Sequence, residues 1–354
     1  MRVMFDKHAF MRSILTERGR KAVPIMAIPG AELLGAKPQD VFRDGELQFR
    51  CIKALSEAAP VAAQVTFMDL SIEAEAFGSK IAFSGHENPD VVEVLLSDTS
   101  AIQALQEPKV GTKRTAEALR CARLCAENLE RPTFGGMIGP YSLAGRLADM
   151  TEMMLLAASE PDLAHELLSK TTSFLKEYAK AIKDAGVAGI MVAEPAAGLL
   201  SPEMCQEFSA KYMEEIVKAV QDDSFMVILH NCGQVEKQVN TLLATGADAL
   251  HVGNAVDICD ILPQVPEHIL LLGNLDPVNV LKNMTADQVY AKTLRLLEKT
   301  ASYKNYILSS GCDLPPAVPM KNIQAFLNAL KTYNKNQEPG GRPWLTLPRF
   351  KLQC

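Results

Sequence analysis

The sequence lacks any apolar run that approaches the ~18–20 residues needed to cross a membrane. Its first 20 residues also lack the apolar core of a secretory signal peptide. The eight cysteines do not follow the spacing of a small disulfide-stapled scaffold. These features favour a cytoplasmic protein whose thiols are reduced, with no membrane as a partner.

Concentrated positive charge is also absent. Lysine and arginine number 36 against 42 aspartates and glutamates, which gives a net charge of −6, and the basic residues are scattered along the chain. A nucleic-acid-binding protein would show a basic patch or stripe, so we expect no nucleic acid as a partner. The apolar fraction of 48% is ordinary for a globular protein with a sizeable core.

A histidine and two cysteines stand at the ends of two short apolar segments. His230 and Cys232 end the segment that begins at residue 225, and Cys312 follows residues 306–308 after a glycine. In an extended chain, residues two apart face the same side about 7 Å from each other, so an imidazole nitrogen and a thiolate can converge on one ion. For any one of the three residues alone, a buried thiol or a hydrogen-bonded core histidine is the simpler interpretation.

The three residues together favour zinc. Two thiolates and an imidazole are soft donors, which select zinc over magnesium or calcium. Three protein ligands leave one coordination position open, as in catalytic zinc sites. We therefore predict that His230, Cys232 and Cys312 are metal ligands.

Eight short apolar segments alternate with amphipathic helical stretches along the chain. We expect strands at residues 24–30, 63–69, 133–140, 189–194, 225–230, 249–252, 269–274 and 306–309. The alternation predicts an α/β fold, a (β/α)₈ TIM barrel that forms a single domain over residues 1–354. An open doubly wound sheet is the alternative, but no Gly-x-Gly-x-x-Gly turn follows any early strand.

Three additions to the barrel are expected. A helical extension precedes the first strand, and the long stretch after the second strand has room for an inserted hairpin around residues 81–94. Glycines and prolines cluster at residues 338–343, which predicts an extended C-terminal arm over residues 338–354. Ser201 before Pro202, and Thr285 before Ala286, mark two helix starts.

Polar residues fall repeatedly at the predicted carboxyl ends of the strands, where barrel enzymes place their chemistry. Besides the three metal-ligand candidates they are Asp69, Tyr141, Glu194, His251, Asn274 and Asp276. We take Glu194 and Asp69 as candidate catalytic residues. Glu194 would be a fourth metal ligand or a proton acceptor, with a structural salt bridge as the alternative.

The other four residues are candidates for substrate binding, each with a structural alternative. Tyr141 would contact substrate or simply pack. His251 fits a hydrogen-bonded wall residue better than a ligand. Asn274 and Asp276 stand in an Asn-x-Asp-Pro run, which also suits a turn that shapes the loop.

Five segments carry a resemblance to a known family. They are residues 67–70 (FMDL), 139–143 (GPYSL), 194–202 (EPAAGLLSP), 273–277 (GNLDP) and 310–316 (SGCDLPP). Together they resemble the uroporphyrinogen decarboxylase superfamily, and within it the zinc-dependent corrinoid methyltransferases such as the methylcobamide:coenzyme M enzymes. The resemblance extends over nearly the whole chain.

The metal ligands separate the branches of this family. Its decarboxylases need no metal and, as a family, lack His-x-Cys after the fifth strand; they use an N-terminal Arg-Gln-x-Gly-Arg pattern that this chain does not have. The methyltransferases carry His-x-Cys and a late cysteine, which His230, Cys232 and Cys312 match. The resemblance thus implies Zn²⁺ and a methylated corrinoid (methylcobamide) on a small partner protein. It also implies a thiol such as coenzyme M as the methyl acceptor.

Three other functions stay open on the sequence. In the first, a methylated oxygen or nitrogen substrate is demethylated and the corrinoid protein accepts the methyl group. The second is metal-free decarboxylation. The third is a non-catalytic scaffold stabilised by zinc, although a structural site is normally closed by four ligands. The sequence names neither the thiol nor the direction of transfer, and it leaves open whether the barrel is a homodimer.

Overall fold

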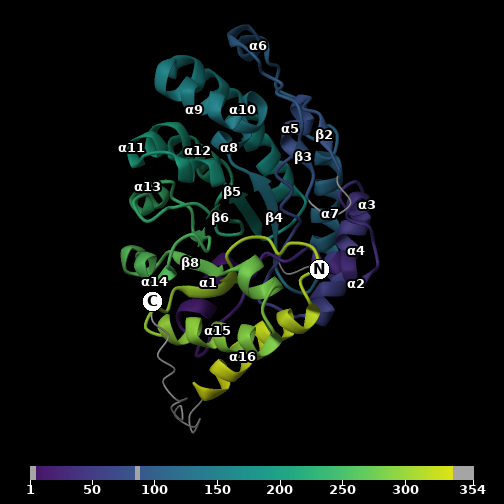
Figure 1. Ribbon diagram of the computed structural model, residues 1–354, viewed down its shortest axis with the longest axis vertical. Helices are drawn as coiled ribbons and strands as arrows, with labels where there is room; N and C mark the ends of the chain where they lie inside the picture. Colours follow the sequence, from purple (N-terminus) through teal and green to yellow (C-terminus); the bar gives the residue numbers. More distant parts are fainter. Residues whose placement is uncertain (1–4, 84–87, 338–354) are drawn as a thin grey trace.

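The computed structural model describes residues 5–83 and 88–337 (Figure 1). Seven parallel strands form one curled sheet, and helices surround these central strands. In their order across the sheet, the strands are β1 (Gln64–Val65), β4 (Thr133–Ile138), β5 (Gly189–Ala193), β6 (Met226–Asn231), β7 (Ala249–Val252), β8 (Leu270–Leu275) and β9 (Tyr306–Ser310). The second to the eighth of the predicted strands are therefore present.

The first predicted strand, over residues 24–30, is wrong. Residues 24–30 form no strand, and the pairing there is limited to Ala22, two residues earlier, which forms an isolated parallel bridge to Leu308 of β9. The carbonyl of Ala22 also accepts a hydrogen bond of 2.9 Å from the amide of Ala62, just before β1. Pro24 and Pro29 have no amide hydrogen to donate to a neighbouring strand, and Pro29 begins helix α2 (Pro29–Leu33) instead. The segment around Ala22 still joins β9 to β1, so the predicted barrel is confirmed.

Alternate residues of each strand face the inside of the barrel. The inward residues of the strands form one cluster: Val65, Phe134, Met191, Ala193, Met226, Ile228, Ala249, Leu270, Leu272 and Ile307. Their neighbours, such as Val192 and Leu229, pack outward against the helices. Because side chains alternate along a strand, His230 continues the inward series of β6, whereas Glu194 continues the outward series of β5.

Helix α1 (Lys7–Leu15) covers the amino-terminal end of the barrel. Phe10, Met11 and Ile14 pack against the inward cluster. Lys7 Nζ lies 3.1 Å from the carboxylate of Asp248, which directly precedes β7. The predicted N-terminal helical extension is confirmed, and it occupies the end opposite to the predicted site.

The main outer helices are α4 (Gly45–Ala58), α7 (Thr115–Asn128), α10 (Pro161–Asp184), α12 (Lys211–Val220), α15 (Ala286–Lys299) and α16 (Met320–Asn336). Both predicted helix starts are confirmed. Ser201 Oγ accepts a hydrogen bond from Met204 N at the start of α11 (Pro202–Cys205), and Thr285 forms a capping box with Gln288. The helical stretch after Pro202 contains a π-helical turn, Gln206–Ala210, before α12.

The predicted insertion is a short antiparallel hairpin of β2 (Ile81–Ala82) and β3 (Asp90–Val91). In Figure 1 it lies beside α5 (Ile72–Phe77). The predicted arm at residues 338–354 lies outside the described residues.

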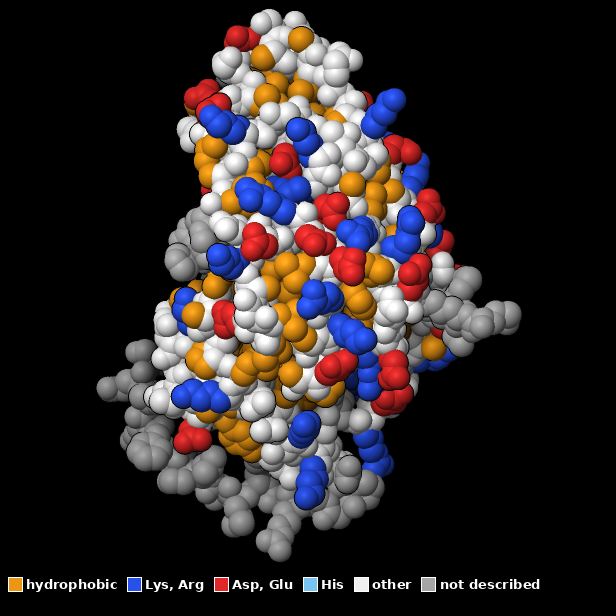
Figure 2. Space-filling view, turned by 90° about the vertical axis from the view of Figure 1, so that its right-hand side faces the viewer, with side chains coloured by type: hydrophobic (Ala, Val, Ile, Leu, Met, Phe, Trp, Pro, Cys, Tyr) orange, Lys and Arg blue, Asp and Glu red, His pale blue; other side chains and the backbone are white. Residues whose placement is uncertain are grey.

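The surface carries charges of both signs. On the face drawn in Figure 2, acidic and basic side chains are interspersed and neither sign forms a continuous field. In the described part of the chain, no helix combines the length and the apolar character needed to cross a membrane.

Candidate metal centre and its cavity

Three metal-binding side chains converge at the carboxyl end of the barrel. One donor atom from each of His230, Cys232 and Cys312 lies within 4.8 Å of the other two, and Cys312 Sγ is 3.7 Å from His230 Nε2. Among the described residues, no other group of three or more histidines, cysteines and carboxylates comes this close together. The structure therefore brings together the three residues that the sequence predicts as ligands.

Strand register and a glycine position these residues. His230 is paired with His251 across β6 and β7, and Cys232 follows two residues after His230. Gly253, just beyond β7, packs against Cys232: a Cβ atom at position 253 would lie 2.5 Å from the Cα of Cys232. Only glycine allows the two chain segments to approach this closely.

A chain of hydrogen bonds assigns the protonation of the His230 ring. Ser309 Oγ donates its single proton to the carbonyl of Val23 at 2.8 Å, so it accepts from His251 Nε2 at 2.9 Å. Burial holds the pKa of His251 well below its usual value, which keeps that ring neutral and leaves its Nδ1 as an acceptor. The Nδ1 atoms of His230 and His251 are 2.8 Å apart. His230 therefore carries its proton on Nδ1, and the lone pair of Nε2 faces the two thiols.

The two thiols shift each other's pKa. The neighbouring Cys312 thiol lowers the pKa of Cys232. The neighbouring Cys232 sulfur, and after it burial, raises the pKa of Cys312. The lowered pKa favours the thiolate form of Cys232, and thiolate is the form that coordinates metal.

This donor set fits Zn²⁺. Two sulfurs and an imidazole nitrogen are the donors that zinc prefers, and a second histidine fixes the ring of the first, as is usual around zinc-bound histidines. Glu194 is not in the group of converging residues, so the described residues offer three ligands and no fourth.

A small cavity of about 150 Å³ adjoins the three residues. Its lining consists of Ile25, Met68, Leu70, Asn88, Pro89, Arg146, Ala193, Pro195, His230, Cys232, Cys312 and Asp313. Asp313 is the lining acid that the sequence analysis missed, although it stands next to Cys312. Its Oδ1 is buried without a hydrogen-bond partner among the described residues, and burial raises the pKa of its carboxyl to about 8.

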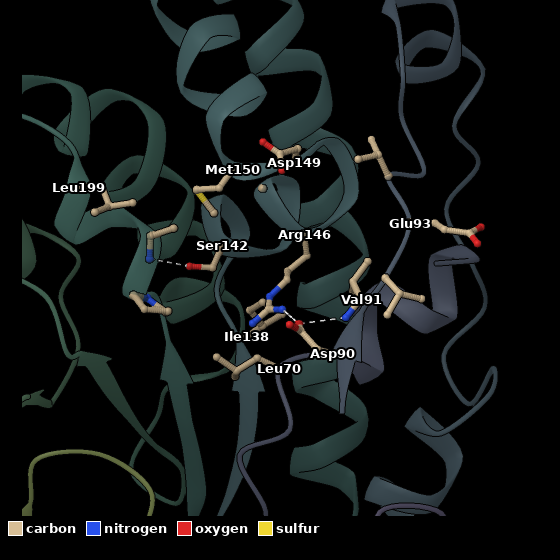
Figure 3. A pocket seen from close by; sticks show the side chains of 15 residues that line it. Leu70, Asp90, Val91, Glu93, Ile138, Ser142, Arg146, Asp149, Met150 and Leu199 are labelled. Carbon is tan, nitrogen blue, oxygen red and sulfur yellow. Dashed lines mark hydrogen bonds and ion pairs between the residues drawn. The ribbon is translucent and has the colours of Figure 1, made fainter. Parts of the chain in front are cut away.

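A larger outer cavity of about 540 Å³ adjoins the small one (Figure 3). Leu70, Arg146 and Pro195 line both cavities. The hairpin strand β3 forms one wall of the outer cavity, and helix α8 (Pro140–Ala148) contributes Ser142 and Arg146. The outer cavity also contains the exposed apolar side chains of Val92, Val94 and Leu199.

Glu194 faces away from the converging side chains of His230, Cys232 and Cys312, called the metal group below. It points toward the first turn of α8. Its carboxylate accepts hydrogen bonds from Tyr141 N at 3.0 Å and from Ser142 N at 2.6 Å, where the positive end of the helix favours a carboxylate. Gly139 leaves the space that the carboxylate fills. Burial raises the pKa of Glu194 to about 7. This geometry fits a role in holding α8 against β5.

The carboxylate of Asp69 is engaged in a buried ion pair with Arg114 and accepts a hydrogen bond of 2.6 Å from Ser71 Oγ. Arg114 also contacts Glu75 at 2.6 Å. Asp69 does not line either cavity, whereas its neighbours Met68 and Leu70 line the small one. Its catalytic role stays a prediction.

The candidate substrate-binding residues hold loops or pack. Tyr141 is fully buried, and its hydroxyl has no partner among the described residues. Asn274 Nδ2 donates to the carbonyls of Gly253 and Val256, and Asp276 accepts from Val278 N and Asn279 N. Neither cavity described above is lined by Tyr141, His251, Asn274 or Asp276.

Comparison with protein-family models gives a match over residues 20–333 to the model described as uroporphyrinogen decarboxylase (URO-D). The chain belongs to the uroporphyrinogen decarboxylase family. This confirms the family that the motifs indicate.

Relatives in the family include both methyltransferases and decarboxylases. The chain is 30% identical to the methylcobamide:CoM methyltransferase MtbA of Methanosarcina mazei over 75% of its own length and 78% of that protein. It is 27% identical to a uroporphyrinogen decarboxylase of Legionella pneumophila (strain Lens), over 76% and 78% of the two chains. Among solved structures, a methyltransferase from Methanosarcina mazei superposes with a TM-score of 0.83 at 21% identity, covering 92% of this chain and 98% of that one, and so shares the fold.

Proposed function

We propose that this chain is a zinc-dependent methyltransferase that moves a methyl group from a methylated corrinoid to a thiol such as coenzyme M. The observation that carries the proposal is the convergence of His230 Nε2 with the sulfurs of Cys232 and Cys312 at the carboxyl end of the barrel. The relative at 30% identity, named a methylcobamide:CoM methyltransferase, supports the same chemistry and direction.

In this proposal His230, Cys232 and Cys312 hold the ion, and the small cavity takes the thiol. When bound, zinc lowers the pKa of a coordinated thiol so that it is a thiolate at neutral pH. His251 and Ser309 keep the Nε2 lone pair of His230 directed at the ion. Met68, Leu70 and Ala193 line the cavity with apolar surface and limit the access of water to the sulfur.

The size of the cavity supports separate places for the two substrates. A cavity of about 150 Å³ holds a molecule of roughly the size of benzene, which suits a small thiol and excludes a corrin ring. The corrinoid therefore approaches from the outer cavity, carried by a small partner protein. The thiol sulfur attacks the methyl carbon, a carbon–sulfur bond forms, and the carbon–cobalt bond breaks with its electron pair left on cobalt.

Arg20, one of the arginines near the N-terminus, is held away from the two cavities. The guanidinium of Arg20 donates hydrogen bonds to the carbonyls of Thr300, Ala301 and Lys304, which precede β9 at the amino-terminal end of the barrel. It is thus held at the end opposite to the cavities. This placement supports the methyltransferase proposal over a decarboxylase that would use Arg20 to bind porphyrinogen carboxylates.

The proposal is tested by metal content and by the zinc coordination shell. Purified protein should contain about one zinc per chain. Adding the correct thiol should introduce a third sulfur into the zinc shell, visible by X-ray absorption at the zinc edge, and should release a proton. Methylcobalamin serves as the stand-in donor, with coenzyme M and homocysteine among the thiols to screen.

Two results would contradict the proposal. Protein purified without chelators that contains no zinc would remove the metal from the mechanism. A zinc shell that no thiol alters, together with methyl-cobalt formation from a methoxylated or methylated amine substrate and reduced corrinoid, would show the opposite direction of transfer.

A further inference from the structure

Arg146 stands at the junction of the two cavities. It lines the small cavity beside the metal group as well as the outer cavity, and no other lysine or arginine among the described residues lines either one. Figure 3 shows its side chain extending from α8 toward Asp90 of the hairpin strand β3, with which it forms an ion pair. Arg146 is therefore the one positively charged side chain, among the described residues, that lines these two cavities.

Two of the acids that line the cavities with Arg146 are engaged elsewhere, whereas Asp313 lines the small cavity with its Oδ1 unpartnered among the described residues. Glu93 lies 2.5 Å from Lys80, and Asp149 accepts hydrogen bonds from the first turn of α9 (Met150–Ser159). Asp90 is the acid that pairs with Arg146, and its side chain is 66% exposed, against 35% for Arg146. An ion pair this exposed contributes little to stability, so a competing anion can displace Asp90.

We propose that Arg146 selects the thiol by binding an anionic group at the end of the molecule opposite its sulfur, and that this anion takes the place of Asp90. The inference rests on the proposed function and adds the residue that sets its specificity. A sulfonate or a carboxylate offers two oxygens to the planar guanidinium and can form a bidentate pair with it. Asn88 supplies a neutral amide side chain to the lining of the same small cavity.

The dimensions of the small cavity restrict the length of such a thiol. With the thiol sulfur beside Cys232 and Cys312 and the anion at Arg146, the molecule must fit a space of about 150 Å³. Such a space holds roughly six to eight heavy atoms, since a cavity of this size binds benzene. Two- or three-carbon thiols with a terminal anion meet this limit. Longer peptide-like thiols such as glutathione do not.

The test compares two thiols that differ only in charge, 3-mercaptopropionate and 3-mercaptopropionamide, with methylcobalamin as donor and zinc-loaded protein. The wild type should methylate the acid with at least tenfold higher kcat/KM than the amide. Arg146→Gln should raise KM for the acid at least tenfold and bring its kcat/KM down to that of the amide. Isothermal titration of each thiol onto the zinc-loaded protein gives the same comparison without turnover.

Two further variants distinguish selection of the thiol by Arg146 from a purely structural role of the Arg146–Asp90 ion pair. Asp90→Asn frees Arg146, so KM for the acid should fall; if the pair only holds the hairpin in place, Asp90→Asn and Arg146→Gln would impair the enzyme alike. Arg120→Gln removes an arginine that forms exposed ion pairs with Asp44 and Glu46 between α4 and α7, and it should leave both thiols unaffected.

The possible failures are distinguishable. Equal use of the acid and the amide by the wild type, or an equal loss for both in Arg146→Gln, overturns the role of Arg146 and leaves the proposed function standing. If neither thiol binds or is methylated, the proposed function and this inference fail together.

Discussion

The ring of His251 meets that of His230 nearly edge-on, with 4.6 Å between the ring centroids and 2.8 Å between the two Nδ1 atoms. Both rings are buried, so water does not replace this hydrogen bond. His251 is thus the residue that fixes the tautomer of a candidate metal ligand, although it lies outside the ligand group itself.

Replacing His251 by phenylalanine should weaken zinc binding. Phenylalanine has no acceptor for the Nδ1 proton of His230, so the His230 ring loses the hydrogen bond that fixes its tautomer and orientation. Loss of such a partner typically lowers metal affinity 10–100-fold. We expect a rise of that size in the zinc dissociation constant, measured by competition with a chromophoric chelator. In the zinc-free wild type, ¹⁵N NMR should show His230 protonated on Nδ1.

Ser309→Ala should shift zinc affinity in the same direction by less, because it removes only the acceptor for His251 Nε2. Ser310→Ala is the matched control, since the Ser310 side chain bonds the backbone of Ile25 and not His251. Unchanged zinc affinity in His251→Phe would show that the ring of His230 is held by other contacts.

Asp69→Asn should destabilise the fold and leave zinc binding unchanged. The substitution removes the negative charge that pairs with the buried Arg114. Breaking a buried ion pair lowers the free energy of unfolding by about 3–5 kcal/mol. Because Arg114 keeps its contact with Glu75, we expect a loss at the lower end of that range. Urea unfolding measures the free energy and elemental analysis the zinc. A variant with wild-type stability and a kcat lowered by orders of magnitude would instead support Asp69 as a catalytic residue.

Glu73 should make the protein less stable as the pH rises. It is fully buried on α5, its Oε2 has no partner among the described residues, and burial raises the pKa of its carboxyl from 4.5 to about 8. The folded state therefore holds a proton that the unfolded state has already released. Stability is unaffected below pH 4.5 and falls between about pH 4.5 and 8, by an amount on the order of a few kcal/mol.

Glu73→Gln removes this titration. The variant should show a smaller decline in unfolding free energy between pH 5 and pH 8, and it should be more stable than the wild type at pH 8. Glu298→Gln, an exposed substitution on α15, provides the control and should leave the pH dependence unchanged. Parallel pH profiles for wild type and Glu73→Gln would mean that water or a nearby group stabilises the ionised Glu73 carboxylate.

The convergence of His230, Cys232 and Cys312 could be predicted from the sequence because strand periodicity brings all three side chains to one end of the barrel. His230 and Cys232 are two residues apart at the end of one strand, and Cys312 follows another strand of the same parallel barrel, so all three reach the same end. The same periodicity predicts that Glu194 faces outward, because it follows the inward-facing Ala193 at the end of β5. The two prolines in residues 24–30 likewise indicated that no full strand forms there.

Other parts of the site depend on contacts between distant segments. Arg146 lies eight residues beyond the end of β4, and it meets Asp90, which precedes it by 56 residues on an inserted hairpin. Nothing in local periodicity relates these two positions. Asp69 likewise gains its partner, Arg114, from the connection that leads into α7. Pairings of this kind follow from packing, which the sequence pattern does not specify.

Cys232→Ala and Cys312→Ala should each abolish zinc binding and methyl transfer while the barrel stays folded. The seven strands and their helices bury a core that does not depend on one ion, in contrast to a zinc finger, which unfolds when it loses its metal. Circular dichroism should show a wild-type spectrum and an unfolding temperature within a few degrees of the wild type. Cys259→Ala, which changes another half-buried cysteine on α14 (Ile258–Ile261), should keep both zinc and activity. Global unfolding of Cys312→Ala would instead identify the zinc as structural, because the barrel unfolds on loss of the ion only if the ion stabilises the fold.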